Sequence, residues 1–118
     1  SKLEWRTLAL TMYTEIQNMA IQFPASFSNW LIPIAGNEFG FSEIVITGAN
    51  ANQISYDLQK EFLPFGIICS SEIYDQKLPV LVGKTFSDTP TYYLCRNQNC
   101  YAPEKNANNF ILALTSFA

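Results

Sequence analysis

The 118-residue sequence contains no histidine. Histidine is the most frequent general acid–base residue and a frequent metal ligand, because its ordinary pKa lies close to neutral pH. Acid–base chemistry would therefore depend on the ten carboxylates, none of which has a carboxylate as its direct neighbour in the sequence. Those at Glu4, Glu15, Asp57 and Glu61 lie on predicted helices at mostly solvent-facing spacing. The sequence thus predicts no catalytic constellation, no cofactor and no metal.

Charged residues are also scarce, at 14% of the chain against about 25% in a typical globular protein. The net charge is -3 and the seven basic residues are scattered, which argues against a nucleic-acid partner. Apolar residues make up 48% of the chain. Part of this apolar surface is expected to be covered, either by upstream domains of a longer polypeptide or by a second copy of the chain.

Long hydrophobic runs are absent, since none approaches the roughly 18–20 residues of a membrane span. The N-terminus lacks the form of a secretory signal, and there is no Asn-x-Ser/Thr acceptor. An odd count of three cysteines argues against a secreted domain framed by disulfides. We therefore expect a soluble, cytoplasmic protein with no membrane partner.

The N-terminal part of the chain has helical periodicity, and we assign residues 1–38 to an antiparallel helical hairpin. One apolar stripe runs from Leu3 to Phe23 at steps of three and four, made of Trp5, Leu8, Met12, Ile16, Met19 and Phe23. Pro24 ends this first helix. A second helix follows, with Phe27, Trp30, Leu31 and Ile34 on one side, a kink expected at Pro33 and Gly36 expected past its end.

Residues 39–118 predict a small α/β domain, which makes the fold class α/β. Strands are expected near 42–47, 66–70 and 91–96, in a three-stranded β-α-β-β-α layer whose first two strands are parallel. The helix between them should be capped by Asn50 and Gln53, carry Ile54, Leu58 and Phe62 on one side, and end at Pro64. A long connection, Ser70 to Pro90, should be packed down by Leu78 to Val82. A last helix should be capped by Asn106 or Asn108, with Phe110, Ile111, Leu114 and Phe117 on its inner side.

Two cysteines near the C-terminal end form the main candidate site. Thr91 to Leu94 fit a strand, and Asn97, Gln98 and Asn99 supply turn chemistry, so Cys95 and Cys100 should face each other at the base of a hairpin. The pair fits reduced structural thiols, a disulfide, or half of a metal site with Cys69 as a further thiol. In a thiol redox module Cys95 would attack, Cys100 would resolve, and Arg96 would supply the cationic setting.

Three weaker patterns have simpler explanations. Gly83-Lys84-Thr85 resembles the tail of a phosphate-binding loop, but position 78 is Leu rather than Gly. Gly48-Ala49-Asn50 could hold an anion on backbone amides, but the spacing of a Gly-rich fingerprint is missing, so a plain β-to-α turn is the better explanation. Trp5, Trp30 and the tyrosines could stack a sugar, yet aromatics at this spacing are typical of a core.

The order of these segments resembles that of one family. The relevant stretches are Glu43 to Gly48, the helix up to Pro64, Leu78 to Leu81, and Pro90 to Pro103 with its Cys-Arg-Asn-x-x-Cys core. From about Pro24 onward the chain is similar to the C-terminal end of the thioredoxin-domain proteins that include the spermatogenesis-associated member.

The resemblance implies a full protein with a thioredoxin-like domain and an (α/α)6 toroid similar to that of sugar epimerases and glycosidases. This chain would supply the last helices of the toroid and a terminal α/β appendage. The family's thioredoxin-type cysteines lie in its N-terminal domain, so no catalytic residue carries over. We predict a non-catalytic C-terminal fragment with a structural or interaction role. The alternatives are a thiol redox module and a carbohydrate-binding or sugar-processing part.

Overall fold

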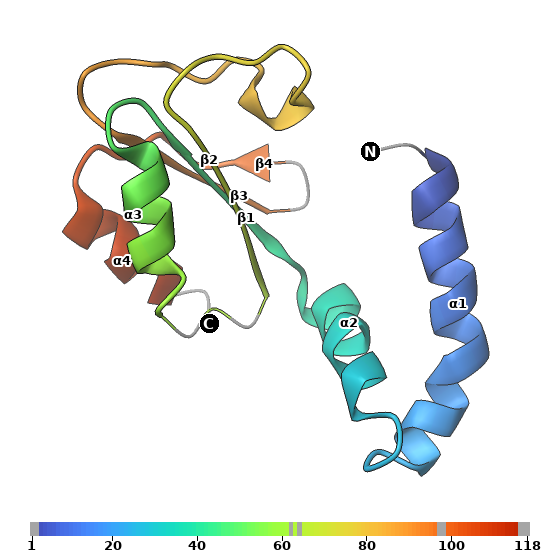
Figure 1. The fold of residues 1–118 in the computed structure, drawn as a ribbon. Coiled ribbons are helices and arrows are strands. Elements are labelled where there is room, and N and C mark those ends of the chain that lie inside the picture. Colours follow the sequence, from blue (N-terminus) through green and yellow to red (C-terminus); the bar gives the residue numbers. More distant parts are fainter. Residues whose placement is uncertain (1–2, 62, 64, 97–98, 116–118) are drawn as a thin grey trace. The chain divides into compact units, whose positions relative to one another are not determined.

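The computed structural model of the chain describes residues 3–61, 63, 65–96 and 99–115. It divides at Gly40 into two compact units, Ser1–Gly40 and Phe41–Ala118 (Figure 1). The first unit is helical and the second is a mixed sheet with helices, so the α/β fold class is confirmed. Among the described residues, no helix has the length and apolarity needed to cross a membrane.

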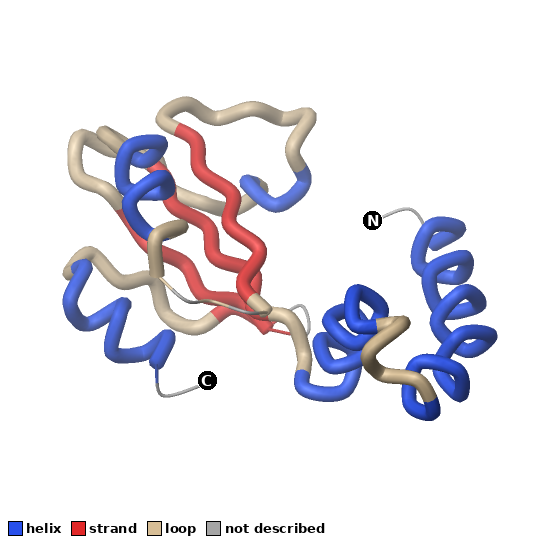
Figure 2. The backbone as a smooth tube through the Cα atoms, turned by 60° about the horizontal axis from the view of Figure 1, so that its bottom comes forward, coloured by secondary structure: helices blue, strands red, loops and turns tan. Residues whose placement is uncertain are grey.

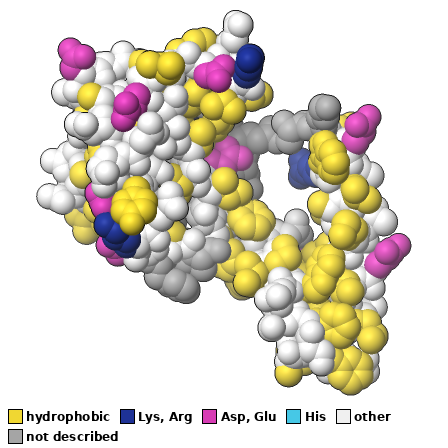
Figure 3. Space-filling view, viewed as in Figure 1, with side chains coloured by type: hydrophobic (Ala, Val, Ile, Leu, Met, Phe, Trp, Pro, Cys, Tyr) yellow, Lys and Arg dark blue, Asp and Glu magenta, His cyan; other side chains and the backbone are white. Residues whose placement is uncertain are grey.

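The helical unit consists of α1 (Leu3–Gln22) and α2 (Ser28–Phe39), which contact each other. Tyr13 donates a 3.0 Å hydrogen bond to Glu38 near the end of α2. The two residues lie at similar distances along the chain from the connection between the helices, so the helices are antiparallel. The hydrogen bond to Glu38 raises the pKa of Tyr13. Ala20 is the one fully buried residue recorded in α1, and apolar side chains run along the helix (Figure 3). Pro24 ends α1 as predicted.

The predicted end of the second helix is wrong. Gly36 does not follow α2 but lies inside it, buried, and the helix continues to Phe39. The helix ends at Gly40, whose positive φ of 87° suits glycine and whose N–H donates to the Gly36 carbonyl. Pro33 also lies within α2, where its ring removes one backbone donor without ending the helix.

The α/β unit is built on a four-stranded sheet in the order β2-β1-β3-β4. The strands of this sheet are drawn in red in Figure 2. Its strands are β1 (Ser42–Thr47), β2 (Gly66–Ser71), β3 (Thr91–Arg96) and β4 (Asn99–Cys100). β1 is parallel to β2 and antiparallel to β3. The three predicted strands are confirmed. The fourth, β4, is the short return of the predicted hairpin, which we had not counted as a strand.

One face of the sheet is covered by α3 (Ala51–Leu58) and α4 (Ala107–Thr115) (Figure 1). The buried residues of this layer are Ile44, Ile46, Ala51, Leu58, Tyr92, Leu94, Phe110 and Leu114. The Tyr92 and Phe110 rings stack with centroids 5.0 Å apart. Phe110 and Leu114 are thus inner residues of α4 as predicted, whereas Ile111 is 42% exposed. Phe62, Pro64 and Phe117 lie outside the described residues. The predicted end of the middle helix at Pro64 is wrong, because α3 ends at Leu58 and is followed by a turn.

The other face of the sheet is covered by the connection between β2 and β3. This connection carries a 3-10 helix, η1 (Pro79–Leu81), whose Leu81 is fully buried against Val45 and Tyr93. The Thr47 hydroxyl donates to the Thr85 carbonyl at 2.6 Å and adds a polar tie. The prediction of a long connection held down by an apolar patch is confirmed for Leu81, while Leu78 and Val82 at the edges of the patch remain exposed.

The two α/β helices begin differently. Asn50 precedes α3 in the left-handed conformation with φ 60°, and its side chain makes no capping hydrogen bond, so the predicted Asn50 side-chain cap is wrong. Asn and Asp tolerate this conformation better than most residues, which explains its place in a tight turn. Asn106 caps α4 as predicted: its Oδ1 accepts the N–H groups of Asn108 and Asn109 at 2.9 and 3.2 Å.

Glu104 should make the stability of the α/β unit depend on pH. Its Oε1 accepts the N–H groups of Asn106 and Lys105, both at 2.8 Å, and these bonds lower the pKa of Glu104 below its ordinary value of 4.5. A carboxyl whose pKa is lower in the folded state stabilises the fold above pH 4.5 and loses this effect as pH falls further. Glu104→Gln should therefore be less stable than the wild type at pH 7, and this difference in unfolding free energy should become smaller toward pH 3. Urea denaturation across this range measures it; an unchanged difference at pH 3 contradicts the prediction.

Candidate functional site

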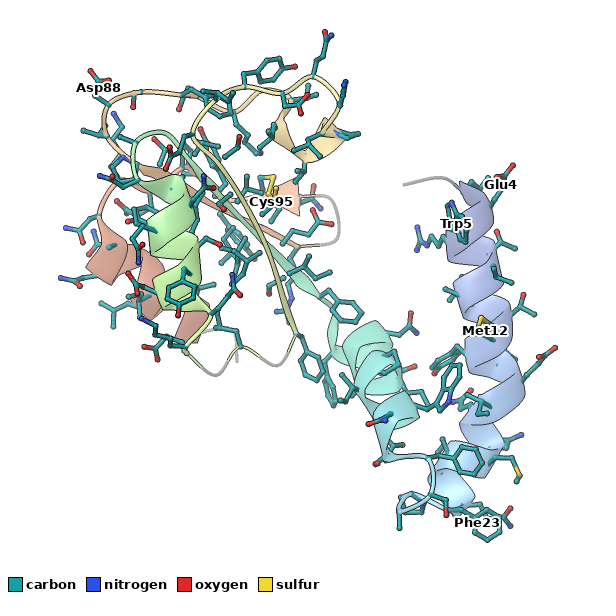
Figure 4. All side chains as sticks on the ribbon, viewed as in Figure 1. Glu4, Trp5, Met12, Phe23, Asp88 and Cys95 are labelled. Carbon is teal, nitrogen blue, oxygen red and sulfur yellow. A yellow bond between two sulfur atoms is a disulfide. The ribbon has the colours of Figure 1, made fainter. Side chains whose placement is uncertain are left out.

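The β3–β4 hairpin joins Cys95 and Cys100 in a disulfide (Figure 4). The two residues are cross-strand partners with Cα atoms 3.9 Å apart. The next pair along the hairpin, Leu94 and Tyr101, is hydrogen-bonded, since the Tyr101 N–H donates to the Leu94 carbonyl at 2.9 Å. Cys95 and Cys100 are therefore a non-hydrogen-bonded pair, the type in which side chains approach most closely. Of the alternatives left open by the sequence, the structure has the disulfide.

The two bridged cysteines have different surroundings. Cys95 lies in β3 and is 2% exposed, because β1 and β4 flank it on both sides. Cys100 lies on the two-residue edge strand β4 and is exposed. A reagent in solution therefore reaches the bridge from the side of Cys100. The predicted division of roles, with Cys95 attacking, does not fit the burial of that residue.

Lys84 supplies the positive charge at the bridge. Its Nζ lies 3.4 Å from Cys100 Sγ and 4.6 Å from the centroid of the Tyr93 ring. The Tyr93 hydroxyl accepts the N–H of Thr85 at 2.8 Å, which ties the backbone beside Lys84 to the sheet. Gly83, with φ 74°, forms the turn before it. Lys84 could not be recognised as a site residue from the sequence, because nothing local links it to cysteines that follow in other strands.

Arg96 is the cation that the sequence predicts beside the cysteines. It follows Cys95 directly in β3, and successive side chains of a strand point to opposite faces of the sheet. Cys95 is on the face of Tyr93, whereas Arg96 is on the face of Leu94 and the helices. The structure therefore places Lys84 at the sulfur, from a different segment of the chain.

The third cysteine, Cys69, is a free thiol in β2. It is partly buried and packs against the cluster of Val45, Leu81 and Tyr93. Burial raises the pKa of the Cys69 thiol, which keeps it protonated at neutral pH. Within residues 3–61, 63, 65–96 and 99–115, no group of three or more Cys, Asp or Glu side chains could hold a metal ion.

The two glycine-containing motifs have structural roles. In the Gly48-Ala49-Asn50 turn, the Gly48 N–H donates to the Ser71 carbonyl and the Ala49 N–H to the Ser87 carbonyl. These amides are engaged and do not form an open anion site. Thr85 is followed by an irregular segment rather than by the helix that a phosphate-binding loop requires.

The aromatic residues that could stack a sugar are dispersed. Trp5 is 67% exposed on α1, and Trp30 is half-buried on α2. Tyr92 and Tyr93 belong to the buried core on opposite faces of the sheet. These tyrosines are structural, so the carbohydrate-binding alternative gains no support from them.

A small hollow of about 180 Å³ lies between α3 and α4. Its lining includes the carboxylates Asp57 and Glu61 above an apolar floor of Tyr92 and Phe110. Lys60 holds Asp57 in an ion pair of 2.6 Å, and this contact lowers the pKa of Asp57. An ionised, paired carboxylate cannot act as a general acid near neutral pH. The hollow is also smaller than the roughly 300–1,000 Å³ of ligand pockets.

Comparisons of the chain with protein families, curated proteins and solved structures found no match. The functional interpretation therefore depends on the geometry of the two units.

Proposed function

We propose that the chain is a non-catalytic structural module of a larger assembly, in which the helical hairpin α1–α2 packs against further helices. The observation that carries this proposal is the apolar surface of α1. Trp5, Leu8, Met12, Met19 and Phe23 follow one flank of the helix, and all are between 45% and 67% exposed. Isolated exposed apolar residues are ordinary, but a continuous stripe of this length is typical of an interface.

A second apolar flank supports a helical partner. Leu3, Leu10 and Ile21 are 43% to 78% exposed on another side of α1. The stripe facing α2, which contains Tyr13, Ile16 and Ala20, lies between the two flanks at ~100° per residue. Apolar side chains thus lie on both sides of the face that contacts α2, with Arg6 and Gln17 between Tyr13 and the second flank. A helix of this kind is suited to a position inside a helical layer, with neighbours on several sides.

The two flanks favour a helical domain over a second copy of the chain. A two-fold dimer buries one self-complementary patch on each copy and would leave the other flank of α1 exposed. A layer of helices covers both flanks. This agrees with the last helices of an (α/α)6 toroid, which the resemblance to the thioredoxin-domain family predicts. That family membership and a cytoplasmic location remain part of the proposal.

The test is the behaviour of the chain alone. The apolar flank should bind the dye ANS and drive concentration-dependent association, measured by light scattering after size exclusion. Leu8→Gln, Met12→Gln and Met19→Gln together should weaken this association on the order of 1,000-fold, since burying each side chain contributes about 1.5–3 kcal/mol. The matched control changes Thr7, Thr11 and Asn18, on the polar side of α1, to Gln and should change neither signal.

Two results would count against the proposal. A strictly monomeric chain without ANS binding would show that the flank of α1 needs no cover. A closed dimer of defined stoichiometry, abolished by the triple Gln variant, would replace the helical domain with a second copy as the partner.

A further inference from the structure

The Cys95–Cys100 bridge differs from a purely structural disulfide in three ways. The bridged residues are only five apart in sequence, so the bridge closes a short loop and removes little chain entropy from the unfolded state. Cys95 is also held independently of the bridge, by the register of β3 against β1. The exposed partner, Cys100, lies beside a lysine ammonium group. The fold can therefore keep Cys95 in place when the bond is open.

We propose that this hairpin is a thiol–disulfide exchange site, in which Cys100 exchanges with a low-molecular-weight thiol such as glutathione and Lys84 stabilises the Cys100 thiolate. This inference is independent of the proposed role of α1. It assigns the exchanging sulfur to Cys100, the exposed residue, and the resolving sulfur to Cys95, the buried one.

The reaction balances with two equivalents of glutathione. A glutathione thiolate attacks Cys100 Sγ, and the Cys95–Cys100 bond breaks as a mixed disulfide forms on Cys100. The bonding electron pair leaves with Cys95, which takes a proton from water. A second glutathione thiolate attacks the glutathione sulfur of the mixed disulfide and releases glutathione disulfide and the Cys100 thiolate. Two glutathione thiols are oxidised, and the protein disulfide is reduced to two thiols.

Lys84 favours the thiolate in both directions of the exchange. A nearby ammonium group lowers the pKa of a cysteine thiol, and the thiolate is the nucleophile. At 3.4 Å, Lys84 Nζ is within hydrogen-bond distance of Cys100 Sγ. The Tyr93 ring below it and the Thr85–Tyr93 hydrogen bond fix the position of this segment. Glutathione, which supplies the attacking thiol, also has carboxylate groups, and the Lys84 ammonium group attracts them.

Two other charged residues lie on the strands that flank the bridge. Glu43 of β1 pairs in register with Cys95, on the same face of the sheet, and its carboxylate opposes the formation of a thiolate. Arg96 of β3 lies on the opposite face, as strand alternation requires. Replacing Lys84 should therefore lower the reactivity of Cys100, whereas replacing Glu43 should raise that of Cys95.

The experiment measures the alkylation of the reduced full chain by iodoacetamide between pH 5 and 10, with each cysteine quantified by peptide mass spectrometry. Lys84→Met should move the midpoint of the Cys100 profile up by about one pH unit, which means ~tenfold slower alkylation at pH 7. Lys84→Arg should restore most of the rate. Glu43→Gln should shift the midpoint of the Cys95 profile downward. Lys77→Met, an exposed lysine in the same connection as Lys84, should leave the Cys100 midpoint unchanged.

A second measurement follows the oxidised chain with reduced glutathione. The mixed disulfide should appear on Cys100, and Cys69 should remain unmodified on the same timescale because it is partly buried. Superimposable Cys100 profiles in the wild type and Lys84→Met would overturn the role of Lys84. Glutathione found on Cys95, or no exchange in the folded wild type, would overturn the site itself. Circular dichroism of each variant confirms that the fold is intact.

Discussion

Replacing Gly48 with Ala is expected to destabilise the α/β unit by about 3 kcal/mol, through backbone strain and overpacking together. Gly48 has φ 94°, a conformation that residues with a Cβ rarely adopt. A Cβ at this position would lie 2.7 Å from the Ser87 carbonyl oxygen and 2.8 Å from the Thr89 carbonyl oxygen. Both atoms belong to the backbone, and the Ala49 N–H holds the Ser87 carbonyl in place. The clash therefore cannot be relieved by the rotation of a side chain.

Gly83→Ala is the matched control for this prediction. Gly83 has a similar φ of 74°, but a Cβ there would meet no atom within 4 Å. Gly83→Ala should lower the free energy of unfolding only by the backbone strain of a left-handed residue, about 1–2 kcal/mol. Urea denaturation monitored by circular dichroism compares the two variants. Equal losses of unfolding free energy would show that the contact between Gly48 and the Ser87–Thr89 segment does not constrain the fold.

Phe110→Ala should destabilise the unit even more, by about 4 kcal/mol, because it removes a large buried ring and leaves a cavity. Phe110 is 3% exposed and stacks on Tyr92, so it is the main contact through which α4 covers the sheet. Denaturation by urea measures the loss. Near-ultraviolet circular dichroism should also show a change in the environment of Tyr92.

The control for Phe110 lies two residues further along the same helix. Leu112 is 68% exposed, and Leu112→Ala should cost less than about 0.5 kcal/mol, as is usual for surface substitutions. Similar effects for Phe110→Ala and Leu112→Ala would mean that α4 is not docked on the sheet through the face described above.

The central strands could be predicted from the sequence because their local pattern is unambiguous. Ile44, Val45 and Ile46 form an apolar β-branched run between two glycines, which indicates burial on both faces. The structure buries Ile44 and Ile46 under the helices and Val45 under the connection that carries η1. The Asn106 cap of α4 was predictable for the same reason, since its hydrogen bonds reach only two and three residues along the chain.

The features that could not be predicted depend on contacts between distant segments. The sequence predicts that α2 ends at Gly36, whereas the structure ends it at Gly40. Either glycine can end a helix, and only the burial of Gly36 inside the helix distinguishes them. Strand order and the position of Lys84 depend on how the connection between β2 and β3 folds over the sheet. The disulfide partners were visible as a spacing of two cysteines, whereas the cation beside them was not.

The helical unit illustrates a different limit. The predicted stripe on α1 exists, and α1 has the predicted length, yet most of the stripe is exposed. Periodicity identifies an apolar face but carries no information on what covers it. This difference between the predicted and the buried face of α1 is the basis of the proposed function.

The central position of β1 has a consequence for synthesis on the ribosome. β1 emerges before β2 and well before β3, the two strands that flank it in the sheet. A nascent chain that stops before Thr91 can pair β1 with β2 but leaves its other edge open, and α4, which completes the core layer that contains Ile44 and Ile46, has not yet been made. The unit can close only after translation has passed α4, and until then β1 lacks one strand partner and part of its apolar cover.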